Sequence, residues 1–493
     1  MDFQAYTLEK HNEWACIQIK APESETRTPV HLCCVIDTSA SMMSENKLKN
    51  VKQSLCFLLD FLGPQDSISV ITFSESARTI LSQTFVSFTE KQNIRTRISF
   101  IQVESNTNIS AGIIQSRETL MIDTTNTKQG ILLLTDGVAN MGLINSKDIL
   151  ELVRNTMTKF SGTSISSVGY GSDHNVELLQ SISTEGGGSY YVVNNIEDVA
   201  NVFGDILGGL VSCISQQVRV ILPNNTEVKS RYAKHSTSDG QIEIVIGDIP
   251  SGMEAAFLAK IPYGSSVTLK GFNVHTHDMF EYNTTVINTD NIEISTNGEA
   301  HYLRFEVLAL LDESRALANK YTQIANINIH IDKIKACIIT ITEHQAEHTH
   351  SLWSVLLDEL NNCKETLENR HHISNNTPQL MSQHAVYLGC MRGLPATLHP
   401  VISNESENCD DPAIPISHVF SNCTQRQISS QLYRTVTEGI VHQQNEPQNN
   451  TEPIRYLFNN SICTIPPLPP GPLRRQVAYS EHISRSTSID TNN

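Results

Sequence analysis

Three oxygen-bearing residues, Asp37, Ser39 and Ser41, alternate directly after the apolar run 32–36. The run is short and uninterrupted, which is typical of a central strand in a parallel sheet that helices cover on both faces. In an extended loop, the three alternating oxygens would converge on one side. Carboxylate and hydroxyl oxygens are hard ligands that suit Mg²⁺, Mn²⁺ or Ca²⁺ rather than Zn²⁺. The pattern therefore predicts a divalent-cation site after this strand.

Two later stretches carry polar residues at similar positions. Thr107 stands in the polar segment 105–112, before an apolar helix pattern, and Asp136 ends a second buried strand pattern, 130–137. Asp-x-Ser-x-Ser alone also occurs in turns and at helix N-termini. Strand-to-helix connections, however, lie at the edge of an open parallel sheet where ligands normally bind. Three such loops can meet there, which would gather five side chains: Asp37, Ser39, Ser41, Thr107 and Asp136.

These five residues resemble the metal-ion-dependent adhesion site of the von Willebrand factor A family. That family builds its site from Asp-x-Ser-x-Ser after the first strand, a Thr in a later loop and an Asp at a TDG-like strand end. The resemblance implies that the hydroxyls of Ser39, Ser41 and Thr107 contact Mg²⁺, Mn²⁺ or Ca²⁺ directly. It implies that Asp37 and Asp136 act largely through water, and that a vacant position takes an Asp or Glu carboxylate from a protein partner. The alternative is a domain that keeps these residues without binding metal.

Size and charge bound the remaining possibilities. A chain of 493 residues is too long for one ordinary core, so we expect two or three domains. Hydrophobic residues make up 39% of the chain and charged residues 18%, which is a globular mixture with some unstructured sequence added. The net charge of −17 argues against a nucleic-acid or anionic-membrane partner, because such partners require a basic face.

The sequence predicts a cytoplasmic protein. Its first residues lack a basic segment followed by an apolar core, and no apolar run approaches the roughly 20 residues that span a bilayer. We therefore expect neither a secretory signal nor a membrane span. The 11 cysteines agree, because the count is odd and Cys33 and Cys34 are neighbours within a predicted strand.

Alternating strand and helix patterns over 31–215 predict an α/β fold, a doubly wound and mostly parallel sheet. They include a strand at 80–86 and helices at 91–100 and 109–122. From 216 to 298 the apolar period changes to two, which predicts a small antiparallel β domain. Residues 1–30 are expected to add one or more strands to it, so that the α/β domain is an insertion beside the β domain.

Helical spacing returns over 299–395, where apolar stripes predict a helical module. Its segment 327–332 is ambiguous, because it also alternates and is rich in β-branched Ile. Residues 396–444 are expected to form a partly ordered extension with one helix at 428–441. Residues 445–493 are expected to be a disordered tail rich in Pro, Asn and Ser.

Two histidine patterns carry alternative chemistry. His344, Glu347 and His348 spell H-x-x-E-H, the inverted zinc-protease signature. A polar neighbourhood and the absence of an obvious third ligand favour exposed histidines instead. His174 lies in a loop at the expected ligand-binding edge of the sheet, where a lone histidine is usually solvated.

The tail contains a second binding motif. Pro469, Pro472 and Arg474 fit P-x-x-P-x-R, a polyproline ligand whose Arg would pair with the acidic groove of an SH3 domain. A plain solvated linker is the alternative, because such short matches are frequent by chance.

The sequence favours a non-enzymatic, cytoplasmic interaction protein that binds partners through the metal-dependent site. The order of modules is also similar to that of some intracellular von Willebrand A proteins, including plant ubiquitin ligases that add a RING. No RING cysteine pattern occurs here, so the first alternative is an adaptor or substrate-recruiting subunit of a ubiquitin-ligase-like assembly. The second alternative is a zinc metallohydrolase acting through His344 and His348.

Overall fold

The structure is a computed structural model that describes most of the chain up to residue 444. The described residues are 1–122, 127–136, 138–171, 174–193, 196–318, 324–369, 377–390 and 421–444. The expected tail at 445–493 and its SH3-type motif at Pro469, Pro472 and Arg474 lie outside them. So do residues 396–420 of the expected extension at 396–444.

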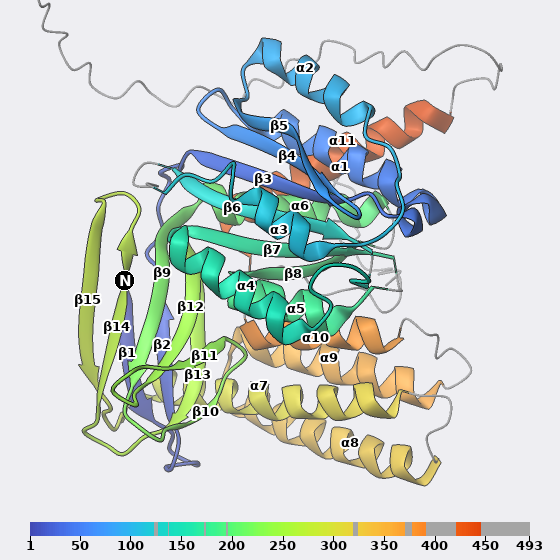
Figure 1. Cartoon of the computed structure of the whole chain (residues 1–493). Helices are drawn as coiled ribbons and strands as arrows, with labels where there is room; N and C mark the ends of the chain where they lie inside the picture. The colour runs from blue at the N-terminus through green and yellow to red at the C-terminus, as the bar shows by residue number, and fades with distance from the viewer. Residues whose placement is uncertain are drawn as a thin grey trace, which may run out of the picture. The chain divides into compact units, whose positions relative to one another are not determined.

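A six-stranded sheet with the order β5-β4-β3-β6-β7-β8 forms the α/β unit (Figure 1). Five strands run parallel and β5 pairs antiparallel with β4, so the sheet is mixed. The strands are β3 (Val30–Asp37), β4 (Ser67–Phe73), β5 (Ala77–Phe85), β6 (Lys128–Thr135), β7 (Thr163–Tyr170) and β8 (Gly187–Val193). The strand order reverses between β3 and β6, which makes their carboxyl ends a switch point for ligands.

Helices cover both faces of this sheet, and alternate residues of β3 enter the two cores. Leu32, Cys34 and Ile36 belong to the core beneath α1, α2 and α6, whereas Cys33 and Val35 belong to the core beneath α3, α4 and α5. This explains why the run 32–36 is apolar throughout. The helices are α1 (Lys47–Phe61), α2 (Phe88–Ser99), α3 (Ile109–Ser116), α4 (Ser146–Lys159), α5 (Val176–Glu185) and α6 (Ile196–Val211).

Three elements differ from the sequence-based expectation in their bounds. Strand β5 begins at Ala77 rather than 80, and helix α2 begins at Phe88, where the Ser87 hydroxyl accepts a hydrogen bond from Glu90 N. The helix expected at 109–122 ends at Ser116. The hydroxyls of Ser116 and Thr119 bind the carbonyls of Ile113 and Ser116, and side-chain bonds of this kind compete with helix continuation.

Two antiparallel sheets follow, and the first strands of the chain belong to one of them. The four-stranded sheet has the order β1-β2-β13-β10, and the five-stranded sheet has the order β11-β12-β9-β14-β15. The strands are β1 (Asp2–Thr7), β2 (Ala15–Lys20), β9 (Cys213–Leu222), β10 (Glu227–Lys229), β11 (Ala233–Ser236), β12 (Ile242–Pro250), β13 (Glu254–Lys260), β14 (Ser266–Asn273) and β15 (Asp278–Thr285).

The segments that enter and leave the α/β unit lie side by side. Thr28 N donates to Val211 O at 2.8 Å, and the Thr28 hydroxyl donates to Cys213 O at 3.0 Å. An ion pair between the buried Lys128 and the partly exposed Asp248 adds a second link, between β6 and β12, with 2.7 Å between Nζ and Oδ2. These contacts fasten the start of the parallel sheet to the five-stranded sheet.

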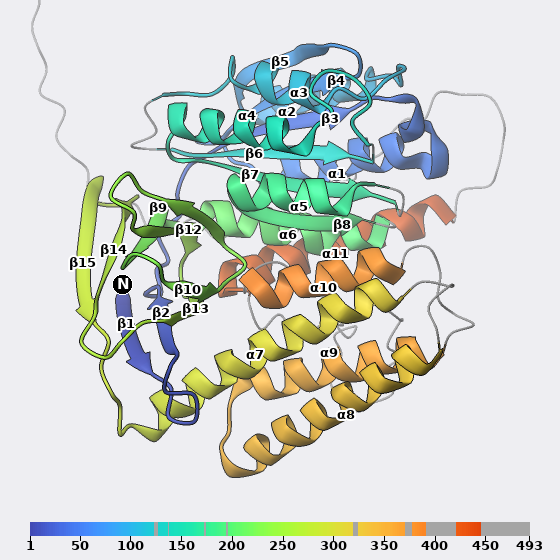
Figure 2. The same cartoon turned by 60° about the horizontal axis from the view of Figure 1, so that its bottom comes forward.

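Four helices lie side by side after the β strands (Figure 2). They are α7 (Ile292–Leu317), α8 (Ile324–Glu347), α9 (Ser351–Glu368) and α10 (Thr377–Cys390). The ambiguous segment 327–332 lies within the helix α8. Ile327 and Ile331 are buried on one face of this helix, whereas Ile329 is 59% exposed, so the spacing of four residues decides the structure. None of the described helices is long and apolar enough to cross a membrane.

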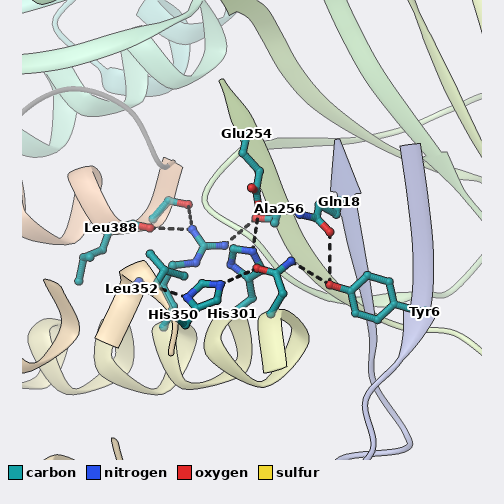
Figure 3. A network of polar contacts seen from close by, with 11 residues as sticks. Tyr6, Gln18, Glu254, Ala256, His301, His350, Leu352 and Leu388 are labelled. Carbon is teal, nitrogen blue, oxygen red and sulfur yellow. Dashed lines mark hydrogen bonds and ion pairs between the residues drawn. The ribbon is translucent and has the colours of Figure 1, made fainter. Parts of the chain in front are cut away.

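A buried polar network joins α7 to its neighbours (Figure 3). The Arg304 guanidinium, which is fully buried, donates to Leu388 O in α10 at 2.7 Å and to Ala256 O in β13 at 2.6 Å. One turn earlier, His301 Nε2 lies 3.1 Å from Glu254 Oε1 in β13. Both contacts tie the helices to the four-stranded sheet.

The helix expected at 428–441 extends over Cys423–Gln444 as α11 and packs on α6. A side chain at Gly208 would place a Cβ 2.5 Å from Gln425 Cα, so the two backbones approach closely there. Gln425 Nε2 also donates to Asp205 O at 3.1 Å, and Leu432 is fully buried in the α/β core. Gln425 and Leu432 therefore fasten the first part of α11 to the α/β unit.

Candidate functional site

Asp37 is the last residue of β3, and both of its carboxylate oxygens accept hydrogen bonds. Ser39 N donates to Oδ1 at 2.8 Å, and the Thr135 hydroxyl donates to Oδ2 at 2.5 Å. Burial raises the pKa of Asp37 to about 6, although the hydrogen bonds from Thr135 and Ser39 oppose the increase. The carboxylate thus fixes the first turn of the loop and fastens it to the end of β6.

Ser39, Ser41 and Asp136 form a chain of neighbouring oxygens. The Ser39 and Ser41 hydroxyl oxygens lie 3.0 Å apart, and the Ser41 hydroxyl donates to Asp136 Oδ1 at 2.8 Å. Ser39 is 1% exposed and Asp136 is 2% exposed, whereas Ser41 faces the solvent. The two loops therefore meet at the switch point with one open side.

Sequence reasoning missed Lys47, whose Nζ lies 2.7 Å from Asp136 Oδ2. Lys47 follows the 3₁₀ helix η1 (Ala40–Asn46) as the first residue of α1, and its side chain is only 4% exposed. One signal was present in the sequence. A cation at the start of a helix opposes the helix dipole, so a lysine there needs a nearby anion.

Thr107 reaches the same region through its backbone. Ala40 N donates to Ser105 O at 2.9 Å, and Asn140 Oδ1 accepts from Thr107 N at 2.9 Å. Thr107 is 4% exposed. In the described part of the chain, no hydrogen bond involves its hydroxyl. The structure thus joins Asp37, Ser39, Ser41 and Asp136 directly, and places the Thr107 loop against the Asp37 loop.

The hydrogen-bonded oxygens of the site are also spaced closely enough to share an octahedral cation such as Mg²⁺. Ligands at about 2.1 Å from the metal and at right angles to each other lie about 3 Å apart. The Ser39–Ser41 and Ser41–Asp136 oxygen pairs have separations of 3.0 and 2.8 Å. The Thr107 hydroxyl makes no hydrogen bond within the described residues and has unused acceptor capacity, so the residues present fit a hard divalent ion held mainly by hydroxyls.

Exposed apolar side chains lie in the two loops that carry the site. Met43 is 78% exposed and stands two residues after Ser41, and Val138 is 56% exposed and stands two residues after Asp136. Met141 is 36% exposed, and its N donates to Thr107 O at 3.2 Å. We call Met43, Val138 and Met141 the apolar rim.

Comparison with known proteins assigns this unit to a family. Residues 31–205 match the family model for the von Willebrand factor type A domain. Residues 31–205 are a von Willebrand factor type A (VWA) domain. A solved structure of a von Willebrand factor type A protein from Catenulispora acidiphila has the same fold, with a TM-score of 0.54 at 13% identity. That likeness covers 74% of this chain and 89% of the other.

Two curated relatives share the VWA region. "Uncharacterized protein YfbK" of Escherichia coli is 25% identical over 255 residues, which is 50% of this chain and 44% of YfbK. The inter-alpha-trypsin inhibitor heavy chain H4 of Bos taurus is 28% identical over 214 residues, which is 42% of this chain and 23% of the heavy chain. The chain thus spans less than half the length of these relatives.

The histidine motifs do not form a second site in the described structure. His344 stacks on Trp353, α8 ends at Glu347, and the His348 carbonyl accepts from Trp353 Nε1 at 3.0 Å. The residues that the structure describes contain no group of three or more His, Cys, Asp or Glu side chains that could hold a metal.

The expectation of a solvated His174 was wrong. It is 5% exposed, and its ring nitrogens lie 2.8 Å from Gly171 O and 2.5 Å from the Tyr190 hydroxyl. It packs directly over Gly169, where a side chain would collide with the imidazole ring. His174 is therefore a core residue rather than a ligand candidate.

Proposed function

We propose that the VWA domain is a non-enzymatic interaction module that captures an Asp or Glu side chain of a protein partner through a bound divalent cation. Mg²⁺ is the expected ion, with Mn²⁺ or Ca²⁺ as substitutes. The hydroxyls of Ser39, Ser41 and Thr107 would hold it, and Asp37 and Asp136 would support it. The observation that carries this proposal is that the oxygens of Ser39, Ser41 and Asp136, from two loops far apart in the chain, meet at 3.0 and 2.8 Å.

Charge explains why capture of a carboxylate would need the metal. The chain has a formal net charge of −17, and Asp37 and Asp136 stand at the site itself. A partner carboxylate would be repelled by these groups. A divalent cation is the largest local charge in such a site, and it reverses the sign that an approaching anion meets.

The apolar rim supports a protein as the partner. Met43 and Val138 are more than half exposed. Removing either apolar side chain from water would lower the free energy. A small carboxylate would leave them exposed. A protein that presents Asp or Glu beside apolar side chains would cover them and gain hydrophobic contact around the central ionic bond.

A pull-down of the full chain in Mg²⁺, repeated in EDTA and read by mass spectrometry, tests this function. We expect partners that are retained in Mg²⁺ and lost in EDTA and in the Asp37→Asn variant. Asp239→Asn changes an exposed carboxylate in the turn after β11, so it should retain the same partners. Thermal melting checks that both variants fold. Partners that bind equally in EDTA and to the folded Asp37→Asn variant would contradict the proposal.

A further inference from the structure

The Lys47 ammonium is a second cation built into the proposed site. Its Nζ lies 2.7 Å from Asp136 Oδ2, and the two side chains are 4% and 0% exposed. The other carboxylate oxygen, Oδ1, accepts the Ser41 hydroxyl at 2.8 Å. Asp136 therefore divides its oxygens, with one toward the lysine and one toward the hydroxyls that would hold the metal.

The position of Lys47 is unfavourable for the helix that carries it. Lys47 is the first residue of α1, where the helix dipole adds partial positive charge, and the first turn holds no acidic residue. Burial of its charge adds a desolvation cost. Helix formation therefore does not account for a buried lysine here, and the ionic contact with Asp136 does.

We propose that Lys47 sets the charge of the site, so that a bound divalent cation leaves a net positive centre for one partner carboxylate. This inference rests on the proposed function. Ionised Asp37 and Asp136 supply two negative charges, Lys47 supplies one positive charge, and the metal supplies two. The sum is +1 with Lys47 and zero without it.

The proposal predicts opposite effects on the two ligands. Lys47 repels the metal, so its removal strengthens metal binding. Lys47 also adds to the positive charge that a carboxylate meets, so its removal weakens capture of the carboxylate. A role in folding alone would weaken both together, or neither. The opposite signs therefore separate a charge-setting role from a structural one.

Two neutral variants and two controls make the experiment. Lys47→Met removes the charge at similar length, and Lys47→Gln also keeps a hydrogen-bond donor for Asp136. Lys47→Arg retains the charge, and Lys49→Met removes an exposed lysine from the same helix. Titration calorimetry with Mn²⁺ measures metal affinity. Acetate then serves as the carboxylate probe, with water-proton relaxation by bound Mn²⁺ reporting its entry into the coordination shell.

We expect both neutral variants to bind Mn²⁺ about tenfold more tightly and acetate about tenfold more weakly, because each removes one positive charge that repels the metal and attracts the carboxylate. Lys47→Arg and Lys49→Met should match the wild type. Unchanged or parallel affinities in folded neutral variants overturn the role of Lys47 and leave the proposed function standing. Failure of both neutral variants to fold also overturns it, because Lys47 is then structural. A wild type that binds no Mn²⁺ overturns the proposed function and this inference together.

Discussion

The Ser41 hydroxyl donates a hydrogen bond to Asp136 Oδ1 across 2.8 Å, although 95 positions separate the two residues in the chain. Sheet pairing accounts for the contact. Ile36 of β3 pairs with Leu134 of β6, so the residues that follow each strand emerge together where the strand order reverses. The parallel sheet thus assembles the site, and local loop sequence alone does not.

The Thr107 hydroxyl should contribute to metal binding and little to folding. It makes no hydrogen bond within the described residues, and its side chain is almost fully buried. We expect Thr107→Val to weaken Mn²⁺ binding at least tenfold and to change the free energy of unfolding by less than about 1 kcal/mol. Thr107→Ser, which keeps a hydroxyl, should retain the affinity. Equal Mn²⁺ affinity for wild type and Thr107→Val, measured by calorimetry, would remove Thr107 from the site.

The close contact between α6 and α11 predicts a sharp difference between two adjacent glycines. A Cβ at Gly208 would lie 2.5 Å from Gln425 Cα, whereas one at Gly209 would lie 3.3 Å from the movable end of the Gln425 side chain. We expect Gly208→Ala to destabilise the protein by about 1–3 kcal/mol and to speed tryptic cleavage after Arg426. Gly209→Ala should behave like the wild type. Equal cleavage rates for the two variants would show that α11 packs on α6 without the close backbone contact at Gly208.

Arg304 should stabilise the packing of the helices on the four-stranded sheet. Its guanidinium donates to Leu388 O, Gly389 O and Ala256 O, and all three carbonyls would lose a charged donor in Arg304→Met. We expect a loss of about 3 kcal/mol in the free energy of unfolding. Arg315→Met is the matched control on α7, because Arg315 forms an exposed ion pair with Glu177 that is worth less than about 1 kcal/mol. Urea denaturation compares the two, and similar losses would contradict the assignment.

Contact between α5 and β11 should depend on pH through His235. The hydrogen bond to Glu185 raises the pKa of His235 above its ordinary value of 6.5, despite partial burial. Burial alone would raise the pKa of Glu185, but its bonds to His235 and Arg154 lower it to about 2, so the carboxylate stays ionised at pH 5.5. The stability that His235 contributes is therefore complete below 6.5 and disappears as pH rises through its folded pKa.

The matched variant is His235→Gln. We expect it to be less stable than the wild type in urea at pH 5.5, and the two proteins should converge at pH 9. A difference of the same size at both pH values would mean that the ionic contact with Glu185 contributes nothing.

Much of the α/β fold could be predicted, because its signals are local. The apolar run 32–36 enters both cores, and polar residues follow the strand at the switch point. Element ends were less predictable. The helix α3 stops at Ser116 because hydroxyl side chains take up backbone carbonyls, and helical periodicity does not register that competition.

Long-range contacts explain the features that sequence reasoning missed. Lys47 meets Asp136 across 89 positions, and Gln425 meets Asp205 across 220. Neither pair leaves a periodic pattern, and the position of Lys47 at a helix start indicates only that an anion is near, not which one. His174 was misjudged for the same reason, because Tyr190 approaches it from the next strand of the sheet.

Direct measurement of bound Mn²⁺ tests the central claim. Electron paramagnetic resonance titration of the full chain should detect one tightly held Mn²⁺, which Mg²⁺ displaces. The double variant Ser39→Ala, Ser41→Ala should lose it, and Ser82→Ala, an exposed change on β5, should keep it. A wild type that holds no Mn²⁺, or a folded double variant that binds Mn²⁺ as tightly as the wild type, would contradict the claim that these hydroxyls hold a divalent cation.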